Sequence, residues 1–222
     1  MRIITVYCLL FLLLKPLAGH AQIAANDSVA APYPSAIESL LTSFQPIYDF
    51  QKGEVIASIG AYDGEREIIF SMMADSLTFY LQDINPIMLE PEQVAVRAEF
   101  WYNQANLTDR NVVFNSVRGR EKDTRLPERF FDKILIENSL HEFTYPKEML
   151  LSVARNLKPG GRVFIGEIMV GWRGQRHEGC LKRLYTEKQL LKLLDETGFV
   201  CKRIVSVNPD CSEYKVFEVV VK

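Results

Sequence analysis

The sequence predicts an α/β fold of three layers, in which a mostly parallel, seven-stranded sheet lies between helices and ends in an antiparallel C-terminal hairpin. From residue 54 onward, short apolar or β-branched runs alternate with helical patterns, as in parallel strands joined by crossover helices. Only the segment 208–214 separates the last two apolar runs, and it is too short for a crossover helix. The chain has 222 residues, of which 48% are hydrophobic, so one domain can bury a sizeable core.

The first residues have the pattern of a secretory signal peptide, predicted to span residues 1–21. Arg2 gives the positive start, an apolar run from Ile3 to Leu14 follows, and small residues precede a cleavage point near Ala21. The run is too short to cross a bilayer easily, so we expect no stable membrane span after cleavage. The prediction is therefore an exported, periplasmic protein. The alternatives are a chain anchored by its uncleaved N-terminal segment and a cytosolic chain.

Residues 22–50 are predicted to form a linker and an N-terminal helix ahead of the main domain, which is expected at 51–222. Positions 22–36 are rich in Ala, Ser, Asn, Asp and Pro, as linkers are. From Ile37 onward apolar residues recur at helical spacing, with Leu40, Leu41 and Phe44 on the same face.

Seven strands and four further helices follow in the predicted domain. The strands are expected in the apolar or β-branched runs Val55–Ile59, Leu77–Leu81, Val112–Val117, Lys133–Glu137, Arg162–Glu167, Val200–Val207 and Lys215–Val221. The helices are expected where apolar residues recur at helical spacing, in Glu65–Asp75, Glu92–Gln104, Lys147–Leu157 and Thr186–Thr197. Thr186 and Gln189 form a capping-box pattern at the start of the last helix, and Gly198 follows its end.

The charge balance and the cysteines exclude some classes of protein. The formal net charge of −2 gives no basic surface, so we expect no nucleic-acid partner. Three cysteines remain after removal of the signal peptide, namely Cys180, Cys201 and Cys211, and an odd number does not make a disulfide framework. No pattern in the sequence predicts an oligomeric state.

The stretch "SIGAYDGE", Ser58 to Glu65, has the composition of a glycine-rich loop between a strand and a helix. Glycines at positions 60 and 64 allow the backbone to approach a ligand closely, at the start of a helix where free N–H groups are available. The spacing does not fit the dinucleotide pattern G-x-G-x-x-G, which argues against a nicotinamide-dependent oxidoreductase. It fits G-x-G-x-G with Tyr62 in place of the middle glycine. A simple turn before a helix is the alternative.

Asp83 lies at the end of the second predicted strand, 23 residues after Gly60. In doubly wound folds an acidic residue about 20 residues beyond the glycine loop binds ribose hydroxyls. The alternative is a solvated carboxylate that caps the turn before Asn85 and Pro86.

Two longer stretches, "FFDKILIENSLHEF" (130–143) and "MLLSVARNLKPGGRVFIGE" (149–167), carry a family resemblance. They resemble the fourth strand, the following helix and the turn into the fifth strand of the class I S-adenosylmethionine-dependent methyltransferases. The resemblance covers roughly residues 52–222, and "NLKPGGRVFIGE" is its most specific part. It implies a Rossmann-like fold, S-adenosyl-L-methionine as cofactor, and methyl transfer to an unidentified, small-molecule acceptor.

The resemblance also implies which positions contact the cofactor. Gly60, Ala61 and Gly64 match the loop that passes under its methionine part. Asp83 matches the acidic residue that binds the ribose, and Ile84 matches the apolar residue beside the adenine. Asp123 matches an acidic group near the adenine amine. Glu137 and Asn138 match positions at the methionine end or in the substrate pocket.

Two positions depart from the family pattern. Ser58 stands where the first motif usually has an acidic residue that orients the methionine amino group, and Tyr62 fills the middle glycine position. These departures, together with the export signal, leave a second interpretation open. In that interpretation the chain is a non-catalytic exported protein that keeps the fold as a binding module.

The predicted catalytic residues are His141 and Glu142, which follow the fourth strand on the side where the site is expected. His141 is the candidate base for an acceptor that must lose a proton. A structural histidine and a surface carboxylate are the alternatives. His177 and Cys180 could offer two metal ligands, to which His141 or Glu142 could be added, but two ligands from one loop are a weak signal and no metal is predicted.

Overall fold

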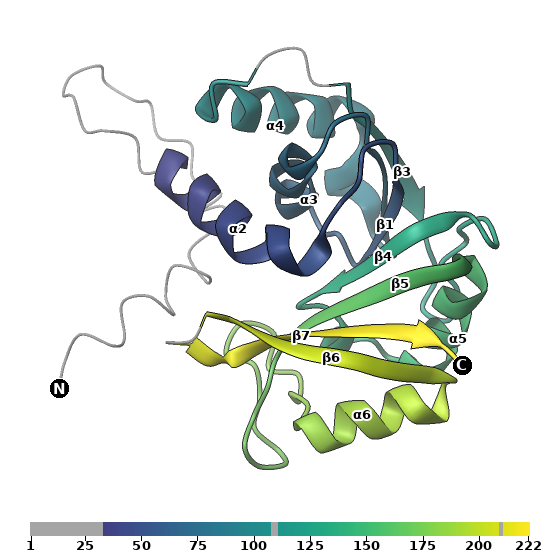
Figure 1. Cartoon of the computed structure of the whole chain (residues 1–222). Helices are drawn as coiled ribbons and strands as arrows, with labels where there is room; N and C mark the ends of the chain where they lie inside the picture. Colours follow the sequence, from purple (N-terminus) through teal and green to yellow (C-terminus); the bar gives the residue numbers. More distant parts are fainter. Residues whose placement is uncertain (1–32, 108–110, 209–210) are drawn as a thin grey trace, which may run out of the picture.

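The computed structural model describes residues 33–107, 111–208 and 211–222 (Figure 1). Its centre is a seven-stranded sheet in the order β3-β2-β1-β4-β5-β7-β6. The first five strands are parallel to one another, and β7 runs antiparallel to both β5 and β6. The predicted fold class, including the antiparallel C-terminal hairpin, is confirmed.

The predicted elements are present, but helix α3 ends five residues before its predicted end, at Phe70, and strands β5 and β7 begin five and four residues earlier than predicted. The strands are β1 (Val55–Ile59), β2 (Thr78–Asp83), β3 (Val113–Arg118), β4 (Phe131–Glu137), β5 (Leu157–Ile168), β6 (Phe199–Asn208) and β7 (Cys211–Val221). The helices are α2 (Tyr33–Tyr48), α3 (Glu65–Phe70), α4 (Pro91–Gln104), α5 (Pro146–Asn156) and α6 (Glu187–Glu196). The capping box of Thr186 and Gln189 is confirmed, because both of its hydrogen bonds are present.

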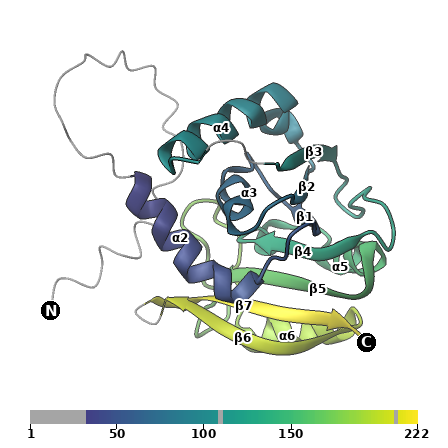
Figure 2. The ribbon, with the colours of Figure 1, turned by 45° about the horizontal axis from the view of Figure 1, so that its top comes forward.

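Helices cover both faces of the sheet, which gives the three layers (Figure 2). On one face α2, α3 and α4 bury apolar side chains against the strands, among them Phe44, Ile68 and Trp101. On the other face α5 and α6 do the same through residues such as Leu150 and Leu194. The two apolar clusters hold the sheet between them and fix the ends of the strands relative to one another.

Helix α2 is part of the domain rather than a separate element before it. Phe44 and Tyr48 on this helix are completely buried in the same apolar cluster as α3 and the sheet. The sequence placed the domain start at residue 51, because the linker composition hides the helix start and because packing between distant segments leaves no local pattern. The helix begins at Tyr33 and continues through Pro46 to Tyr48.

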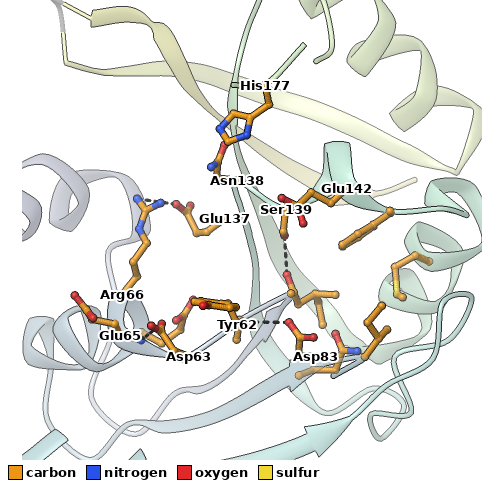
Figure 3. A pocket seen from close by; sticks show the side chains of 18 of the residues that line it. Tyr62, Asp63, Glu65, Arg66, Asp83, Glu137, Asn138, Ser139, Glu142 and His177 are labelled. Atoms are coloured by element: carbon orange, nitrogen blue, oxygen red, sulfur yellow. Dashed lines mark hydrogen bonds and ion pairs between the residues drawn. The ribbon is translucent and has the colours of Figure 1, made fainter. Parts of the chain in front are cut away.

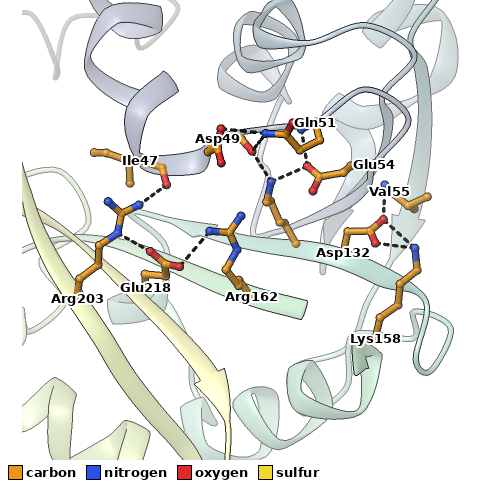
Figure 4. Close-up of polar contacts among 11 residues, drawn as sticks. Ile47, Asp49, Gln51, Glu54, Val55, Asp132, Lys158, Arg162, Arg203 and Glu218 are labelled. Carbon is orange, nitrogen blue, oxygen red and sulfur yellow. Dashed lines mark hydrogen bonds and ion pairs between the residues drawn. The ribbon is translucent and has the colours of Figure 1, made fainter. Parts of the chain in front are cut away.

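Polar contacts at the amino ends of the strands connect the end of α2 to the sheet (Figure 4). The Lys133 ammonium, which is 1% exposed, lies 2.6 Å from the Glu54 carboxylate and donates to the Asp49 carbonyl. Arg203 on β6 donates to the Ile47 carbonyl at 2.9 Å. The buried Lys133 ammonium is thus paired and hydrogen-bonded, as a buried charge must be. These contacts lie at the edge opposite the carboxyl ends of the strands.

The predicted signal peptide and all but the last residues of the predicted linker lie outside the described residues. Among the helices that the structure describes, none is both long and apolar enough to cross a membrane.

Candidate active site

A cavity of about 660 Å³ opens at the carboxyl ends of β1, β2 and β4 (Figure 3). This edge of a doubly wound sheet is where ligands bind. Most of the positions that the sequence singled out line the cavity: Gly60, Ala61, Asp83, Ile84, Glu137, Asn138 and Glu142. Gly64, Asp123 and His141 do not line it.

Residues of the glycine loop, among them Gly60 and Ala61, line this cavity. Gly60 and Gly64 both have a φ of 74°, a conformation that favours glycine. A Cβ atom at position 60 would lie 2.8 Å from the Cβ of Ser139, so the loop passes close to the chain that leaves β4. Gly64 instead caps the start of α3, and a Cβ there would lie 2.8 Å from Leu81. The loop therefore has the backbone shape of a ligand-binding turn.

Tyr62 adopts the left-handed conformation expected of the glycine that it replaces, with a φ of 53°. Its side chain is 58% exposed and lines the cavity. The substitution therefore keeps the course of the loop and adds an aromatic ring to the cavity wall.

Asp83 links the glycine loop to the end of β2. One carboxylate oxygen accepts a hydrogen bond from the Tyr62 amide at 3.1 Å, and the other accepts one from the Asn85 amide at 2.8 Å. The turn-capping role is thus present. A carboxylate has about four acceptor positions, so lone pairs remain for two hydroxyl groups of a ligand. Ile84 beside it is 51% exposed and offers an apolar surface to the cavity.

A second carboxylate lies beside the serine that replaces the family's acidic residue. Ser58 donates a hydrogen bond of 2.7 Å to Glu67, which is 2% exposed and lines the cavity. Burial raises the pKa of Glu67 from 4.5 to about 7, although Ser58 and the charge of Arg66 act in the opposite direction. The sequence does not single out Glu67, because an acidic residue in the first turn of a helix is common at helix N-termini.

Glu137 lines the cavity, but its carboxylate is held by protein groups. It accepts hydrogen bonds from the Tyr48 and Tyr214 hydroxyl groups and forms an ion pair of 3.0 Å with Arg66. These partners come from α2, β7 and α3, so Glu137 joins three distant segments at the wall of the cavity. A direct contact of Glu137 with a ligand would compete with these bonds.

Asn138 follows Glu137 at the cavity, with a φ of 49°. Its backbone N–H donates to the Gly166 carbonyl at 2.7 Å. Within the described part of the chain, its buried side-chain oxygen has no hydrogen-bond partner. A buried acceptor without a partner costs about 1–3 kcal/mol, so this atom favours a donor group on a bound molecule.

The structure places Asp123 away from the cavity, which corrects its predicted contact with the adenine amine. Its carboxylate accepts a hydrogen bond from the Arg125 amide at 2.7 Å and pairs with Arg155 at 3.4 Å. Glu121, two residues earlier, lines the cavity instead. The register of this segment is set by a tight turn between Arg120 and Asp123, which the sequence pattern does not indicate.

The two predicted catalytic residues occupy different positions. Glu142 lines the cavity and its side chain is 52% exposed. His141 lies behind it and is buried; its Nδ1 is 2.8 Å from the completely buried Glu167 carboxylate. Burial acts to lower the pKa of His141, but the hydrogen bond and charge of Glu167 outweigh it, so the pKa is raised. His141 is therefore paired with a carboxylate that sequence reasoning did not identify.

His177 and Cys180 come close to His141 in the fold. One ligand atom from each of the three residues lies within 4.8 Å of the others. His177 also lines the cavity, at the side opposite Asp83 in Figure 3. The loop after β5 thus contributes His177 to the wall of the cavity, whereas Cys180 does not line it.

These residues fit S-adenosyl-L-methionine, the cofactor that the resemblance implies. The loop at Gly60 has no room for a side chain, and Asp83 offers acceptors that suit a ribose diol. The carboxylate of Glu67 suits an ammonium group, and the unpartnered oxygen of Asn138 suits a hydrogen-bond donor. The donor set therefore agrees with a cofactor that carries hydroxyl, amine and amino-acid groups.

Comparison with known proteins agrees with this assignment. The sequence profile of a family described as "Methyltransferase domain" matches residues 34–203, which include all but the first residue of helix α2. No curated protein matches the chain.

Solved structures show the same fold at low sequence identity. An S-adenosylmethionine-dependent methyltransferase from Aquifex aeolicus is 20% identical, with a TM-score of 0.61 over 85% of this chain and 98% of that one. The 1,6-didemethyltoxoflavin-N1-methyltransferase of Burkholderia thailandensis, solved with S-adenosylhomocysteine, is 21% identical, with a TM-score of 0.59 over 85% and 79%. The [4+2]-cyclase SpnF is 17% identical, with a TM-score of 0.62 over 88% and 85%. The profile match over most of the chain is what decides the family: this chain belongs to the family of methyltransferase-domain proteins.

Proposed function

We propose that this methyltransferase acts on a small molecule that binds at the Glu142 end of the cavity. The observation that carries the proposal is that one cavity extends from Asp83 to Glu142 and His177. Its volume of about 660 Å³ lies within the range typical of small-molecule and cofactor sites. Since the Asp83 end suits the nucleoside of the cofactor, the remaining space at the opposite end is assigned to the acceptor.

The cofactor would be held by groups along the first half of the cavity. Asp83 would bind the ribose hydroxyls, Ile84 would contact the adenine, and the loop at Gly60 and Ala61 would pass under the methionine part. Glu67 would bind the methionine ammonium group, because its carboxylate is held at the end of β1 by Ser58 and lines the cavity. Each of these contacts orients the ligand, and orientation is the main contribution of an enzyme to a displacement reaction.

Bound S-adenosylmethionine supplies an electrophilic methyl group on a sulfonium. The protein's part in the transfer is to align the acceptor atom with that methyl group and to accept a proton when the acceptor carries one. Glu142 is the proton acceptor in this proposal, because its carboxylate reaches the cavity. His141 acts as a positioning residue: its Nε2 lies 3.9 Å from the Glu142 carboxylate, and Glu167 fixes its ring from the other side.

Isothermal titration of the purified chain with S-adenosylmethionine and with S-adenosylhomocysteine tests the cofactor half of the proposal. We expect saturable binding of both, and a rise in melting temperature. No heat and no thermal shift at high ligand excess would reject it in favour of a non-catalytic binding module.

Transfer from methyl-labelled S-adenosylmethionine in a cell extract tests the acceptor half. We expect the label in the low-molecular-mass fraction. Label recovered in protein or nucleic acid would contradict a small-molecule acceptor. The same assay with Glu142→Gln should show a loss of about 100-fold in rate, which is typical of a missing general base.

We also propose that the chain is exported after cleavage near Ala21. The support is the signal-peptide pattern of residues 1–21. Mass spectrometry of the periplasmic protein should give a mature N-terminus close to Gln22. An intact Met1 in exported material would reject cleavage.

A further inference from the structure

Three residues with metal-binding side chains converge next to Glu142, and one of them, His177, lines the cavity. His141 comes from the segment after β4, whereas His177 and Cys180 come from the loop after β5. One ligand atom from each lies within 4.8 Å of the others, and the two imidazole rings have their centroids 5.0 Å apart. Two segments of the fold therefore bring two nitrogen ligands and one sulfur ligand to one place.

His141 has the hydrogen-bonding pattern of a metal-ligating histidine. Its Nδ1 pairs with Glu167 at 2.8 Å, and Glu167 also accepts a bond from the His141 amide at 3.2 Å. With Nδ1–H bound to the carboxylate, the lone pair is on Nε2. Nε2 is buried and makes no hydrogen bond within the described part of the chain. A carboxylate that orients the histidine from behind is the usual second contact of a metal ligand.

The loop that carries the other two residues is closed by its own hydrogen bonds. The His177 amide donates to the Lys182 carbonyl at 2.8 Å, and the Leu181 amide donates to the His177 carbonyl at 2.9 Å. The Cys180 amide donates to Nδ1 of the His177 ring at 3.3 Å, which places a lone pair on that nitrogen. Since this bond is long, a metal ion at Nδ1 could replace it at little cost. His177 is buried and Cys180 is partly exposed, so the loop presents both side chains from a fixed turn.

We propose that His141, His177 and Cys180 bind a zinc ion at this end of the cavity. Two imidazoles and one thiolate form a ligand set that zinc favours, and three protein ligands with one open position are typical of catalytic zinc sites. Glu142 borders this cluster, because its carboxylate lies 3.9 Å from His141 Nε2, and it also lines the cavity.

Zinc binding would change the roles of His141 and Glu142. With zinc bound, His141 is a ligand, and Glu142 is the group of the predicted catalytic pair that remains to accept a proton. The proposal concerns metal binding alone and does not rest on binding of S-adenosylmethionine, since no cofactor-contacting residue is among the ligands.

Metal analysis of the full chain, purified, loaded with zinc and dialysed, tests the site directly. We expect one zinc ion per chain, and a thiolate-to-metal charge-transfer band when cobalt replaces zinc. The variants Cys180→Ser and His177→Gln should lose the ion, and Cys180→Ser should lose the band. Cys201→Ser is the matched control, because Cys201 is the other free cysteine described and lies outside the cluster; it should keep both.

The zinc affinity of Glu167→Gln distinguishes a metal site from a chance cluster of side chains. Because Glu167 hydrogen-bonds the ring of His141, we expect Glu167→Gln to weaken zinc affinity about 10- to 100-fold, measured by competition with a chromophoric chelator. Absence of zinc in the wild-type chain overturns the proposal, as does unchanged affinity in both Cys180→Ser and His177→Gln. Titration of each variant with S-adenosylmethionine checks its fold, and failure of that titration in the wild type counts only against the proposed cofactor binding.

Discussion

Ser58 donates a hydrogen bond of 2.7 Å to Glu67, so a buried carboxylate lies beside the end of β1 although the strand itself has serine there. The acidic group that the first family motif usually places on the strand is thus supplied by the first turn of α3. Glu67 lies nine residues after Ser58, and its carboxylate lines the cavity.

Glu67→Gln should weaken binding of S-adenosylmethionine at pH 8 by about tenfold or more, because a charged hydrogen bond is worth about 1.5–3 kcal/mol. At pH 6 the wild-type carboxyl is largely protonated, since burial raises its pKa to about 7. The difference in affinity between variant and wild type should therefore shrink at pH 6. Titration calorimetry at both pH values measures it; an equal difference at the two would contradict the role of the charge.

Glu67→Gln should also change the free energy of unfolding. The folded pKa of Glu67 is about 7 and lies above the unfolded value of 4.5, so the folded state binds the extra proton between these values. The free energy of unfolding then falls as the pH rises from 4.5 to 7, and the full loss is present at pH 8. Glu67→Gln removes this loss and should gain up to about 3 kcal/mol relative to wild type between pH 5 and pH 8. Urea unfolding at both pH values measures the gain, and parallel pH profiles for the two proteins would contradict it.

Asp83→Asn should lower the affinity for S-adenosylmethionine by at least about tenfold, because the amide has fewer acceptor positions than the carboxylate. Asp123→Asn is the matched control, since the structure places this aspartate outside the cavity. It should change the affinity by less than about twofold, as a surface substitution does. Calorimetric titration compares the two variants. A larger effect at Asp123 than at Asp83 would mean that the cofactor is placed in the wrong part of the fold.

Gly60→Ala should be more harmful than the same substitution at Gly53. Both glycines have positive φ, 74° and 80°, so both variants bear the same kind of backbone strain. Only at position 60 would the added Cβ lie 2.8 Å from Ser139; at position 53 nothing lies within 4 Å. We expect an additional loss of about 1–3 kcal/mol in the free energy of unfolding, together with weaker cofactor binding. Equal urea midpoints for the two variants would show that the loop has room there.

Tyr214→Phe should destabilise the fold by about 1–3 kcal/mol, because it removes a hydrogen bond of 2.6 Å to the buried carboxylate of Glu137. The control is Tyr62→Phe. Tyr62 is 58% exposed, so this variant should change stability by less than about 0.5 kcal/mol. Denaturant unfolding of the two variants provides the comparison. A neutral Tyr214→Phe would show that Tyr48 and Arg66 satisfy Glu137 without it.

The sequence by itself determined the order and type of the elements. Strands and helices each have a local apolar period, and the short 208–214 segment requires an antiparallel hairpin whatever the rest of the chain does. The positions of the glycine loop and of Asp83 also followed from the sequence, because both lie directly at strand ends that share one edge of a parallel sheet.

Only the tertiary structure decided which side chains meet. The contacts Ser58–Glu67, His141–Glu167 and Glu137–Tyr214 depend on how strands and helices pack, and no local period encodes such packing. Asp123 is a case where a local prediction failed. A tight turn between Arg120 and Asp123 places Glu121, not Asp123, at the cavity. A local pattern fixes the face of an element on which a residue lies. Which residue it contacts on that face depends on the register of the sheet and on side-chain volume, and both are properties of the whole fold.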